Sequence, residues 1–214
     1  MPTAVKRGRN GPGGSGSLLG KESRVGAHVS DGSIMTPMEN RVVSDKVVYE
    51  GAICRVRKLG LETEAGRVVS RDLIEMADAV VIVPVLPDGS VVLIRNERFA
   101  VEEDLLELPA GKLDVEGEDP AACAARELAE ETGYSAGRIE RLGGFYSCPG
   151  AVTEYMHVFL ATDLTAGEQN LQGCERIRVE PIPPDRLTEM IASGELHDGK
   201  SLAAVLLWRM HKDG

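Results

Sequence analysis

The sequence predicts an α+β protein in which a mixed β-sheet is covered by helices on both sides. Segments with strand patterns are interspersed with a few helical segments and do not alternate regularly with them. A helix with clear start and stop signals is expected over residues 120–132. Two continuous apolar runs, at 79–86 and 90–95, are expected to form central strands that are buried on both faces.

Residues 1–40 differ in composition from the rest of the chain. They contain GRNGPGGSGSLLG and little periodic apolar content, which is typical of a flexible tail or linker. Their basic residues are too few to predict a transit peptide or a docking arm. We therefore expect this segment to lie outside the folded domain.

The first folded part of the chain is expected at residues 41–77. From Lys46 onward apolar and polar residues alternate around a turn at Glu64–Gly66. This pattern predicts antiparallel strands near 46–60 and 67–76. The simplest arrangement of the two is a β-hairpin.

The remaining residues, 78–214, are expected to form the main domain. Its two apolar runs are separated by a Pro-Asp-Gly turn at 87–89. The elements expected after the helix at 120–132 are strands near 139–147, 155–162 and 175–182, a helix from Pro183 to about 193, and an amphipathic helix over Lys200–Met210.

Local signals mark both ends of the helix at 120–132. Asp119 can cap the first turn, and Pro120 suits the first helical position. Gly133 can supply the left-handed residue that ends a helix. These three residues predict the helix boundaries without any information from the rest of the chain.

One side of this helix gathers carboxylates. At 100° per residue, Glu127, Glu130 and Glu131 fall in one sector, although glutamates at i and i+4 repel by a few tenths of a kcal/mol. A bound divalent cation would reverse the sign of that interaction, and oxygen-only ligands favour Mg²⁺ or Mn²⁺ over zinc. A solvated acidic face with Arg126 paired to Glu130 is the alternative. The residues expected to pack on the other side are Ala121, Ala124, Ala125 and Leu128.

The composition argues against several classes of partner. A net charge of −10 disfavours binding to nucleic acid, because such proteins carry clustered Lys and Arg. No stretch approaches about 20 consecutive apolar residues, so we expect no membrane span. We expect a soluble, cytoplasmic protein whose cysteines are reduced thiols, because their spacing suggests neither a disulfide framework nor a zinc site. These cysteines are Cys54, Cys123, Cys148 and Cys174.

The residues around the helix form a longer motif. Glu118 is followed by seven residues and then by RELAEETGY, which spans Arg126–Tyr134. This arrangement resembles the signature of the Nudix hydrolases, and every fixed polar position from Glu118 onward matches. Two departures are that six residues rather than five separate Gly111 from Glu118, and that Tyr134 stands where an aliphatic residue is usual. The extra residue lies in a loop, where an insertion costs little.

The resemblance extends over roughly residues 46–211 and is similar to the ADP-ribose pyrophosphatase branch. The features shared with this branch are an N-terminal hairpin region, Arg98 before LLELPAG, and Pro149, which stands fifteen residues beyond Tyr134. A proline there also suits any turn between strands. Asn96 and Glu97 stand where the branch commonly has a glutamine and an aromatic residue. If that aromatic residue stacks on adenine in relatives, the contact is absent here or supplied by Phe99, Tyr146 or another chain.

The resemblance implies a fold, an activity and an assembly. The fold is the Nudix α/β/α sandwich with an added N-terminal antiparallel β region. The activity is Mg²⁺-dependent hydrolysis of a nucleoside diphosphate derivative, in the first place ADP-ribose to AMP and ribose 5-phosphate, with Mn²⁺ as a possible substitute. A nucleotide-sugar hydrolase acting on a compound such as GDP-mannose, and a non-catalytic nucleotide-sensing module, are the alternatives. A homodimer formed through residues 41–77, with a small-molecule nucleotide as substrate, is also implied.

The resemblance further implies roles for individual residues. The metal ligands would be Glu127 and Glu131, with Glu130 as a contributor that also counts among the catalytic residues, and the Ala110 carbonyl. Structural support would come from Gly111, Glu118 and Arg126. Substrate contacts would involve Arg98 with phosphate, Glu107 with the ribose or a metal-bound water, and Pro149. The general base would be Glu175, with Glu168 and then Glu154 as alternatives.

Overall fold

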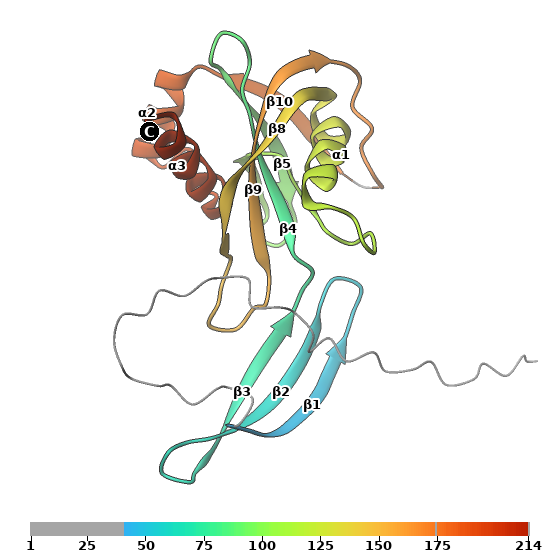
Figure 1. Cartoon of the computed structure of the whole chain (residues 1–214), viewed down its shortest axis with the longest axis vertical. Coiled ribbons are helices and arrows are strands. Elements are labelled where there is room, and N and C mark those ends of the chain that lie inside the picture. The colour runs from blue at the N-terminus through green and yellow to red at the C-terminus, as the bar shows by residue number, and fades with distance from the viewer. Residues whose placement is uncertain (1–40, 174, 214) are drawn as a thin grey trace, which may run out of the picture. The chain divides into compact units, whose positions relative to one another are not determined.

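The computed structural model describes residues 41–173 and 175–213, so the tail expected at residues 1–40 lies outside the described residues. Figure 1 shows the elements along the chain. They are β1 (Val42–Glu50), β2 (Arg55–Glu62), β3 (Val68–Glu75), β4 (Ala79–Pro84), β5 (Val91–Arg98), β6 (Glu103–Glu107), β7 (Ala110–Lys112), α1 (Pro120–Thr132), β8 (Tyr134–Tyr146), β9 (Tyr155–Ala166), β10 (Ile177–Ile182), α2 (Pro184–Ser193) and α3 (Gly199–Asp213).

The N-terminal region forms a three-stranded antiparallel sheet in the order β1-β2-β3. The single strand predicted over 46–60 is therefore wrong. The chain reverses between Gly51 and Cys54, where the Gly51 N–H donates to the Cys54 carbonyl at 3.0 Å. This turn was missed because GAIC contains none of the Asn-Gly or Asp-Gly pairs that mark tight hairpins.

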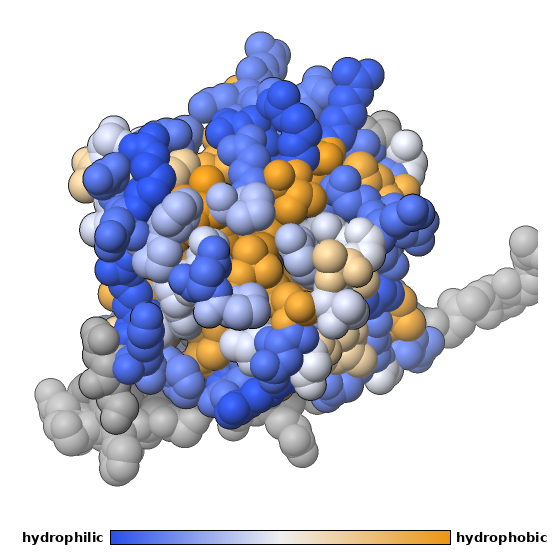
Figure 2. All heavy atoms as spheres, turned by 90° about the horizontal axis from the view of Figure 1, so that it is seen from above, coloured by the Kyte–Doolittle hydropathy of each residue, from blue (hydrophilic) through white to orange (hydrophobic). Residues whose placement is uncertain are grey.

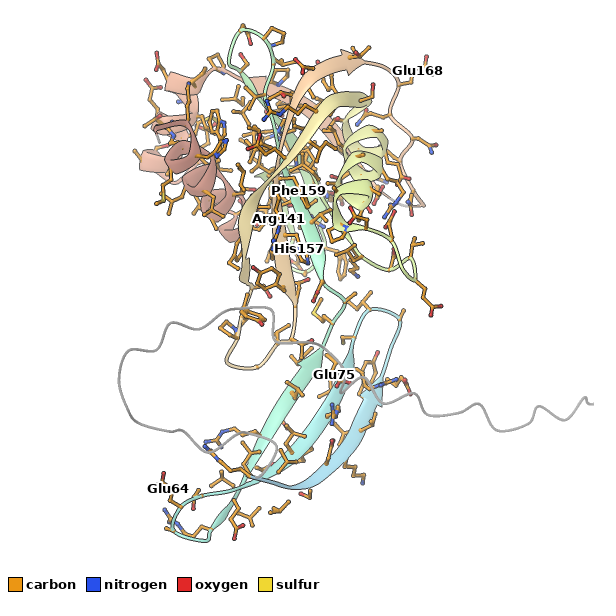
Figure 3. All side chains as sticks on the ribbon, in the orientation of Figure 1. Glu64, Glu75, Arg141, His157, Phe159 and Glu168 are labelled. Atoms are coloured by element: carbon orange, nitrogen blue, oxygen red, sulfur yellow. The ribbon has the colours of Figure 1, made fainter. Side chains whose placement is uncertain are left out.

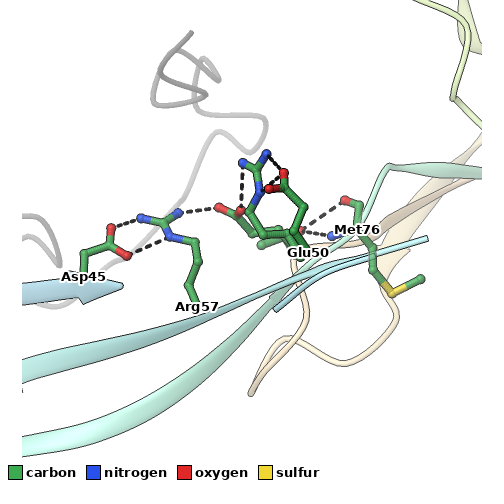
Figure 4. Close-up of polar contacts among 7 residues, drawn as sticks. Asp45, Glu50, Arg57 and Met76 are labelled. Atoms are coloured by element: carbon green, nitrogen blue, oxygen red, sulfur yellow. Dashed lines mark hydrogen bonds and ion pairs between the residues drawn. The ribbon is translucent and has the colours of Figure 1, made fainter. Parts of the chain in front are cut away.

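Ion pairs cross the strands of this sheet (Figure 4). Arg57 on β2 donates from Nε to Asp45 Oδ1 on β1 at 2.9 Å, and it also pairs with Glu75 on β3. Arg55 pairs with Glu50 at 2.5 Å. Exposed pairs of this kind add little to stability, but opposite charges facing each other favour one strand register over others.

Two further sheets make up the main domain. One has the order β7-β4-β9-β8 and the other β10-β5-β6. Strands β4 and β9 are parallel and the other pairs are antiparallel, so the predicted mixed sheet is confirmed. The apolar runs predicted as central strands become β4 and β5, which lie in different sheets and meet at a bridge between Val85 and Val91.

Helices cover both faces of the β7-β4-β9-β8 sheet, which confirms the predicted sandwich (Figure 1). The side chains of β4 alternate between two cores. Val80 and Ile82 belong to the core under α1. Val81 and Val83 belong to the core that includes residues of α2 and α3.

Seen from above in Figure 2, hydrophobic residues show between hydrophilic ones on this end of the molecule.

Helix α1 has the predicted boundaries, but its buried side differs from the prediction. Ala125 is exposed, whereas Cys123 is fully buried. At 100° per residue, the buried arc is turned by roughly 60° from the predicted one, toward the glutamates. As a result Glu131 is only 5% exposed and belongs to the packed side of the helix.

The segment between β5 and α1 contains two strands that the sequence did not predict, β6 and β7. Strand β7 has three residues and pairs with β4 through Ala110, Gly111 and Lys112. A strand this short depends on its distant partner and leaves almost no periodic pattern in the sequence. Within residues 41–173 and 175–213, no helix is long and apolar enough to span a membrane.

Candidate active site

Both ends of α1 are fixed as the sequence predicted. Asp119 Oδ1 accepts from the Ala121 N–H at 2.8 Å. Gly133 has φ of 75° and donates its N–H to the Ala129 carbonyl at 2.9 Å. Because these contacts fix where the helix starts and stops, they also fix the direction in which its glutamates point.

Strand β7 packs directly against the glutamates of α1. A Cβ built on Gly111 would lie 1.9 Å from Glu127 Cδ, so only glycine leaves room for this carboxylate. One residue earlier, the Ala110 N–H donates to Glu131 Oε2 at 2.9 Å. The two glutamates therefore meet the backbone of two adjacent strand residues.

The Ala110 carbonyl is directed toward the same helix. The Ile82 N–H donates to the Pro109 carbonyl and the Leu113 N–H donates to the Asp78 carbonyl, so these residues face β4. In an antiparallel pair, the N–H and C=O of a residue point to the same side, and this side alternates along the strand. Since the Ala110 N–H points to α1, its carbonyl does as well.

Arg126 lies among three carboxylates. It binds Glu118 through Nε at 3.0 Å and Nη2 at 3.1 Å, and its Nη1 donates to Glu127 Oε1 at 2.7 Å. Glu130 Oε2 lies 3.5 Å from Nη1. The hydrogen bonds from Arg126 lower the pKa of Glu118. The structure thus brings together Glu118 and Arg126, and Arg126 also makes the i to i+4 pair with Glu130.

Burial changes the acidity of the other two glutamates. The pKa of Glu131 is raised to about 8, mainly by burial and also by the charges of Glu127 and Glu175, against the lowering effects of the Ala110 N–H and Arg98. Burial also raises the pKa of Glu127, against the lowering effect of Arg126. Both carboxylates are therefore held at a cost in desolvation, which a fold with no use for them would avoid.

The loop between β9 and β10 caps the C-terminal end of α1. The Asn170 N–H donates to the Glu130 carbonyl at 2.9 Å, and Gln169 Nε2 donates to the Glu131 carbonyl at 2.6 Å. The last carbonyls of a helix have no partner inside the helix, so these contacts satisfy two of them. The loop is thereby held beside the glutamates.

Gln172 connects this loop to the acidic cluster. Its Nε2 donates to Glu130 Oε2 at 2.7 Å, and its backbone N–H donates to Glu175 Oε2 at 2.8 Å. Glu175 is therefore close enough for its charge to act on Glu131. In Figure 3, by contrast, Glu168 points away from α1. The structure brings Glu175 to the cluster and leaves Glu168 outside it.

Arg98 and Glu107 bind each other. Arg98 Nε lies 2.7 Å from Glu107 Oε1, and its Nη2 lies 2.7 Å from Oε2. Glu107 is fully buried, whereas 41% of the Arg98 side chain is exposed. Protein cations bind both oxygens of Glu107, and its expected contact with a ribose or a metal-bound water stays a prediction. Arg98 keeps an exposed edge.

Sequence reasoning missed the second cation on Glu107. Lys200 binds Glu107 Oε2 and lies 2.9 Å from Asp198 Oδ2. The signal available in the sequence was weak. Asp198 stands three residues before Ser201 at the start of an amphipathic segment, which is a helix-capping pattern rather than a site motif.

Pro149 and Glu154 lie in the segment that joins β8 to β9. Tyr146 pairs with Tyr155 at one end of the hairpin, and Tyr134 pairs with Ala166 at the other. Pro149 and Glu154 follow the first end, whereas the loop carrying Glu175 follows the second. At about 3.4 Å per residue, the two ends are roughly 40 Å apart along the strands. Ala110 pairs with Val81, and Val81 pairs with Val158, so β7 is level with the first end. The roles expected of Pro149 and Glu154 stay predictions.

The donors around β7 and α1 suit a hard divalent cation. They are carboxylate oxygens and one backbone carbonyl, and the missing side chain of Gly111 leaves the space in which Glu127 lies. In residues 41–173 and 175–213, no three acidic, histidine or cysteine side chains already converge as a metal cluster. Arg126 is instead the present counter-charge of Glu127.

Comparisons with known proteins show which family the sequence resembles. The NUDIX domain family model matches residues 76–205. The chain is 30% identical over 173 residues to an ADP-ribose pyrophosphatase of Bacillus subtilis (strain 168), covering 80% of this chain and 93% of that protein. It is 37% identical over 122 residues to a GDP-mannose pyrophosphatase of Salmonella typhimurium, and this match covers 53% of this chain and 63% of that protein.

A solved structure described as an ADP compounds hydrolase shares the fold. Its TM-score is 0.71 at 24% sequence identity, and the match covers 81% of this chain and 94% of that one. The family model spans more than half of the sequence, including β7, α1 and the loop with Glu175. The chain belongs to the Nudix family of pyrophosphohydrolases, in the ADP-ribose pyrophosphatase branch.

Proposed function

We propose that this protein hydrolyses the diphosphate linkage of ADP-ribose to give AMP and ribose 5-phosphate, with Mg²⁺ as cofactor and Mn²⁺ as a possible substitute. A relative that is similar over 93% of its own length is an ADP-ribose pyrophosphatase. The observation that carries the proposal is the meeting of Glu127 and Glu131 with the backbone of Ala110 and Gly111, close to Arg98.

In this proposal Glu127, Glu131 and the Ala110 carbonyl hold the metal, and Glu130 contributes to the same shell. When bound, the metal would neutralise diphosphate oxygens that otherwise repel an incoming nucleophile. Arg126 would then bind Glu118 and so hold the loop before α1 against the helix. Arg98 would bind a phosphate oxygen through the edge that Glu107 leaves exposed.

Glu175 is the proposed general base. It lies on a loop that Gln172 ties to Glu130, and it is exposed enough to meet a water molecule. A carboxylate in this position can accept the proton of an attacking water as the diphosphate bond breaks. The neighbouring acid Glu168 points outward in Figure 3.

We predict that Glu175→Gln lowers kcat by about two orders of magnitude, because positioned general bases contribute roughly that much or more. Glu168→Gln is the matched control, since it is the same substitution in the same loop, and its kcat should stay within about twofold of the wild type. Steady-state rates at saturating Mg²⁺ make the comparison. A larger loss in the Glu168 variant would move the base to that residue.

A nucleotide sugar such as GDP-mannose is the second candidate substrate. The GDP-mannose pyrophosphatase of Salmonella typhimurium has a higher sequence identity to this chain, 37% against 30%, but over 122 residues rather than 173. The same carboxylates and Arg98 would act on either substrate, because they address the diphosphate that both compounds share. The preference would depend on groups that contact the base and the sugar.

Product release from a substrate panel tests the proposed function. The panel contains ADP-ribose, GDP-mannose, UDP-glucose, NADH and diadenosine polyphosphates, each assayed with Mg²⁺ and with EDTA. We expect magnesium-dependent AMP formation with ADP-ribose as the best substrate. Activity led by another compound would keep the mechanism and change the substrate. Nucleotide binding without turnover would favour a sensing module instead.

We also propose that residues 41–77 form a homodimer interface and that residues 78–214 form the catalytic domain. The N-terminal sheet carries large apolar side chains that are about half exposed or more: Val43, Val47, Val48, Tyr49, Ile53 and Val68. An exposed apolar group of this kind favours association. Light scattering should give twice the 23.0 kDa chain mass, and Val47→Glu should shift it toward one chain. A monomeric wild type would contradict the proposal.

A further inference from the structure

The first turn of α3 is bonded to the segment that leads from β6 into β7. The Leu108 N–H donates to Ser201 Oγ at 2.7 Å, and Ser201 is fully buried. Asp198 Oδ2 accepts from the Ser201 hydroxyl at 2.5 Å and from its N–H at 3.1 Å. These contacts attach α3 to a backbone segment two residues before Ala110.

Lys200 links the same turn to the side chains of the proposed site. Its Nζ binds Glu107 Oε2 and lies 2.9 Å from Asp198 Oδ2, and its side chain is 17% exposed. On its other side, Glu107 receives the two hydrogen bonds of Arg98. The four side chains form a row of alternating charge, Arg98, Glu107, Lys200 and Asp198.

This row is neutral as a whole, because it contains two cations and two anions. Glu107 is fully buried, and a buried carboxylate is stable only when cations and hydrogen bonds compensate its charge. With Lys200 present, the two acids Glu107 and Asp198 have two counter-ions, Lys200 and Arg98. Without Lys200, one excess negative charge would remain beside the place where an anionic diphosphate is proposed to bind.

Arg98 is the member of the row that reaches solvent. It uses Nε and Nη2 for Glu107, so the edge with Nη1 is the one that a ligand would meet. A guanidinium held by a bidentate carboxylate has little freedom to rotate, which fixes the direction of that edge. The positive potential at this edge depends on how fully the acids behind it are neutralised.

We propose that Lys200 is a positioning residue for substrate binding. Its positive charge offsets the negative charges of the two acids Glu107 and Asp198, so that the charge of Arg98 remains available to a diphosphate. The inference rests on the proposed function, because it takes Arg98 as the phosphate-binding group. It assigns a role to the start of α3, which is 93 residues from Glu107 in the sequence. Lys200 itself need not touch the substrate.

The test is a charge-balance experiment on the full-length protein. Lys200→Met should raise KM for the substrate that the wild type prefers by about tenfold while kcat changes by less than about twofold, because binding charge and not chemistry is lost. Adding Asp198→Asn restores neutrality and keeps an oxygen that accepts from the Ser201 N–H. The double variant should recover KM to within about threefold of the wild type.

Two more variants separate charge from other effects. Lys200→Gln keeps a hydrogen-bond donor for Glu107 but lacks the positive charge, so it should raise KM as Lys200→Met does. It tests the charge effect even if the methionine variant folds poorly. Lys212→Met, at an exposed position in the last turn of the same helix, should leave KM unchanged. Thermal melting of each variant shows whether a change in KM accompanies unfolding.

Several outcomes would overturn the inference. An unchanged KM in Lys200→Gln would exclude the charge effect, and a double variant as poor as Lys200→Met would indicate that Lys200 contacts the substrate or acts through packing. The substrate panel with the wild type tests the proposed function independently of the Lys200 variants. If the wild type binds ADP-ribose without cleaving it, calorimetric Kd replaces KM in every comparison. A wild type that neither binds nor cleaves a panel compound would refute the proposed function and this inference together.

Discussion

Glu131→Gln is expected to lower kcat by about a thousandfold while the protein stays folded. A thousandfold loss corresponds to about 4 kcal/mol of transition-state stabilisation, which is the order expected when a metal that polarises phosphoryl oxygens is lost or displaced. Glu131 combines the position of a proposed ligand with near-complete burial. Few other acidic side chains in the described part of the chain lie in surroundings that disfavour the charged form so strongly.

The fold should tolerate this substitution. The amide oxygen of glutamine can accept the same hydrogen bond from the Ala110 N–H, and the side chains have nearly the same shape. Glutamine carries no charge that burial could penalise, so the melting temperature should stay equal or rise. Mg²⁺ titrations of the rate, together with thermal melts, provide the measurement.

Glu116→Gln is the matched control for this experiment. Glu116 is exposed and lies in the loop before α1, so its loss should change neither the rate nor the melting temperature. Glu127→Gln should resemble Glu131→Gln in rate, since both carboxylates meet the β7 backbone. Wild-type turnover in either variant would refute the assignment of these residues as metal ligands.

Gly111→Ala is expected to lower kcat/KM by about a hundredfold. The added methyl carbon would lie 1.9 Å from Glu127 Cδ and 2.2 Å from its Oε1, so the carboxylate has to move. A displacement of about 1 Å in a catalytic group can cost a factor of this size. The affected atoms are the end of a flexible side chain, so the loss of folding free energy should stay below about 2 kcal/mol.

The control is Gly199→Ala, because a Cβ at this position meets nothing within 4 Å. It should retain wild-type kinetics and a wild-type melting temperature. Activity and Mg²⁺ dependence are measured for both variants beside thermal unfolding. If Gly111→Ala were as active as the wild type, the close packing of β7 on Glu127 would have no part in catalysis.

Local signals account for what was predicted best. The boundaries of α1 follow from Asp119, Pro120 and Gly133, each of which acts on its own neighbours in the chain. The central strands β4 and β5 follow from apolar runs that are long enough to be buried on both faces. The motif from Glu118 to Tyr134 pointed to the correct family because its spacing is set along a single helix.

The orientation of α1 could not be predicted from the same signals. Alanines at 121, 124 and 125 suggested a packed side opposite the glutamates, yet Ala125 is exposed and Glu131 is buried. The small side chains allowed several rotations of the helix about its axis. The choice among them was made by β7, whose backbone N–H at Ala110 binds Glu131 and whose Gly111 accommodates Glu127.

By itself, the sequence determined the family, the main helices and strands, and the carboxylates of α1, because capping and periodicity depend on residues a few positions apart. The tertiary structure alone decided which charges far apart in the chain are paired. Arg98 and Glu107 were both expected to face substrate, but Glu107 is buried between Arg98 and Lys200. Lys200 is 93 residues from Glu107, and an ion pair across that separation forms only when the fold places both ends together.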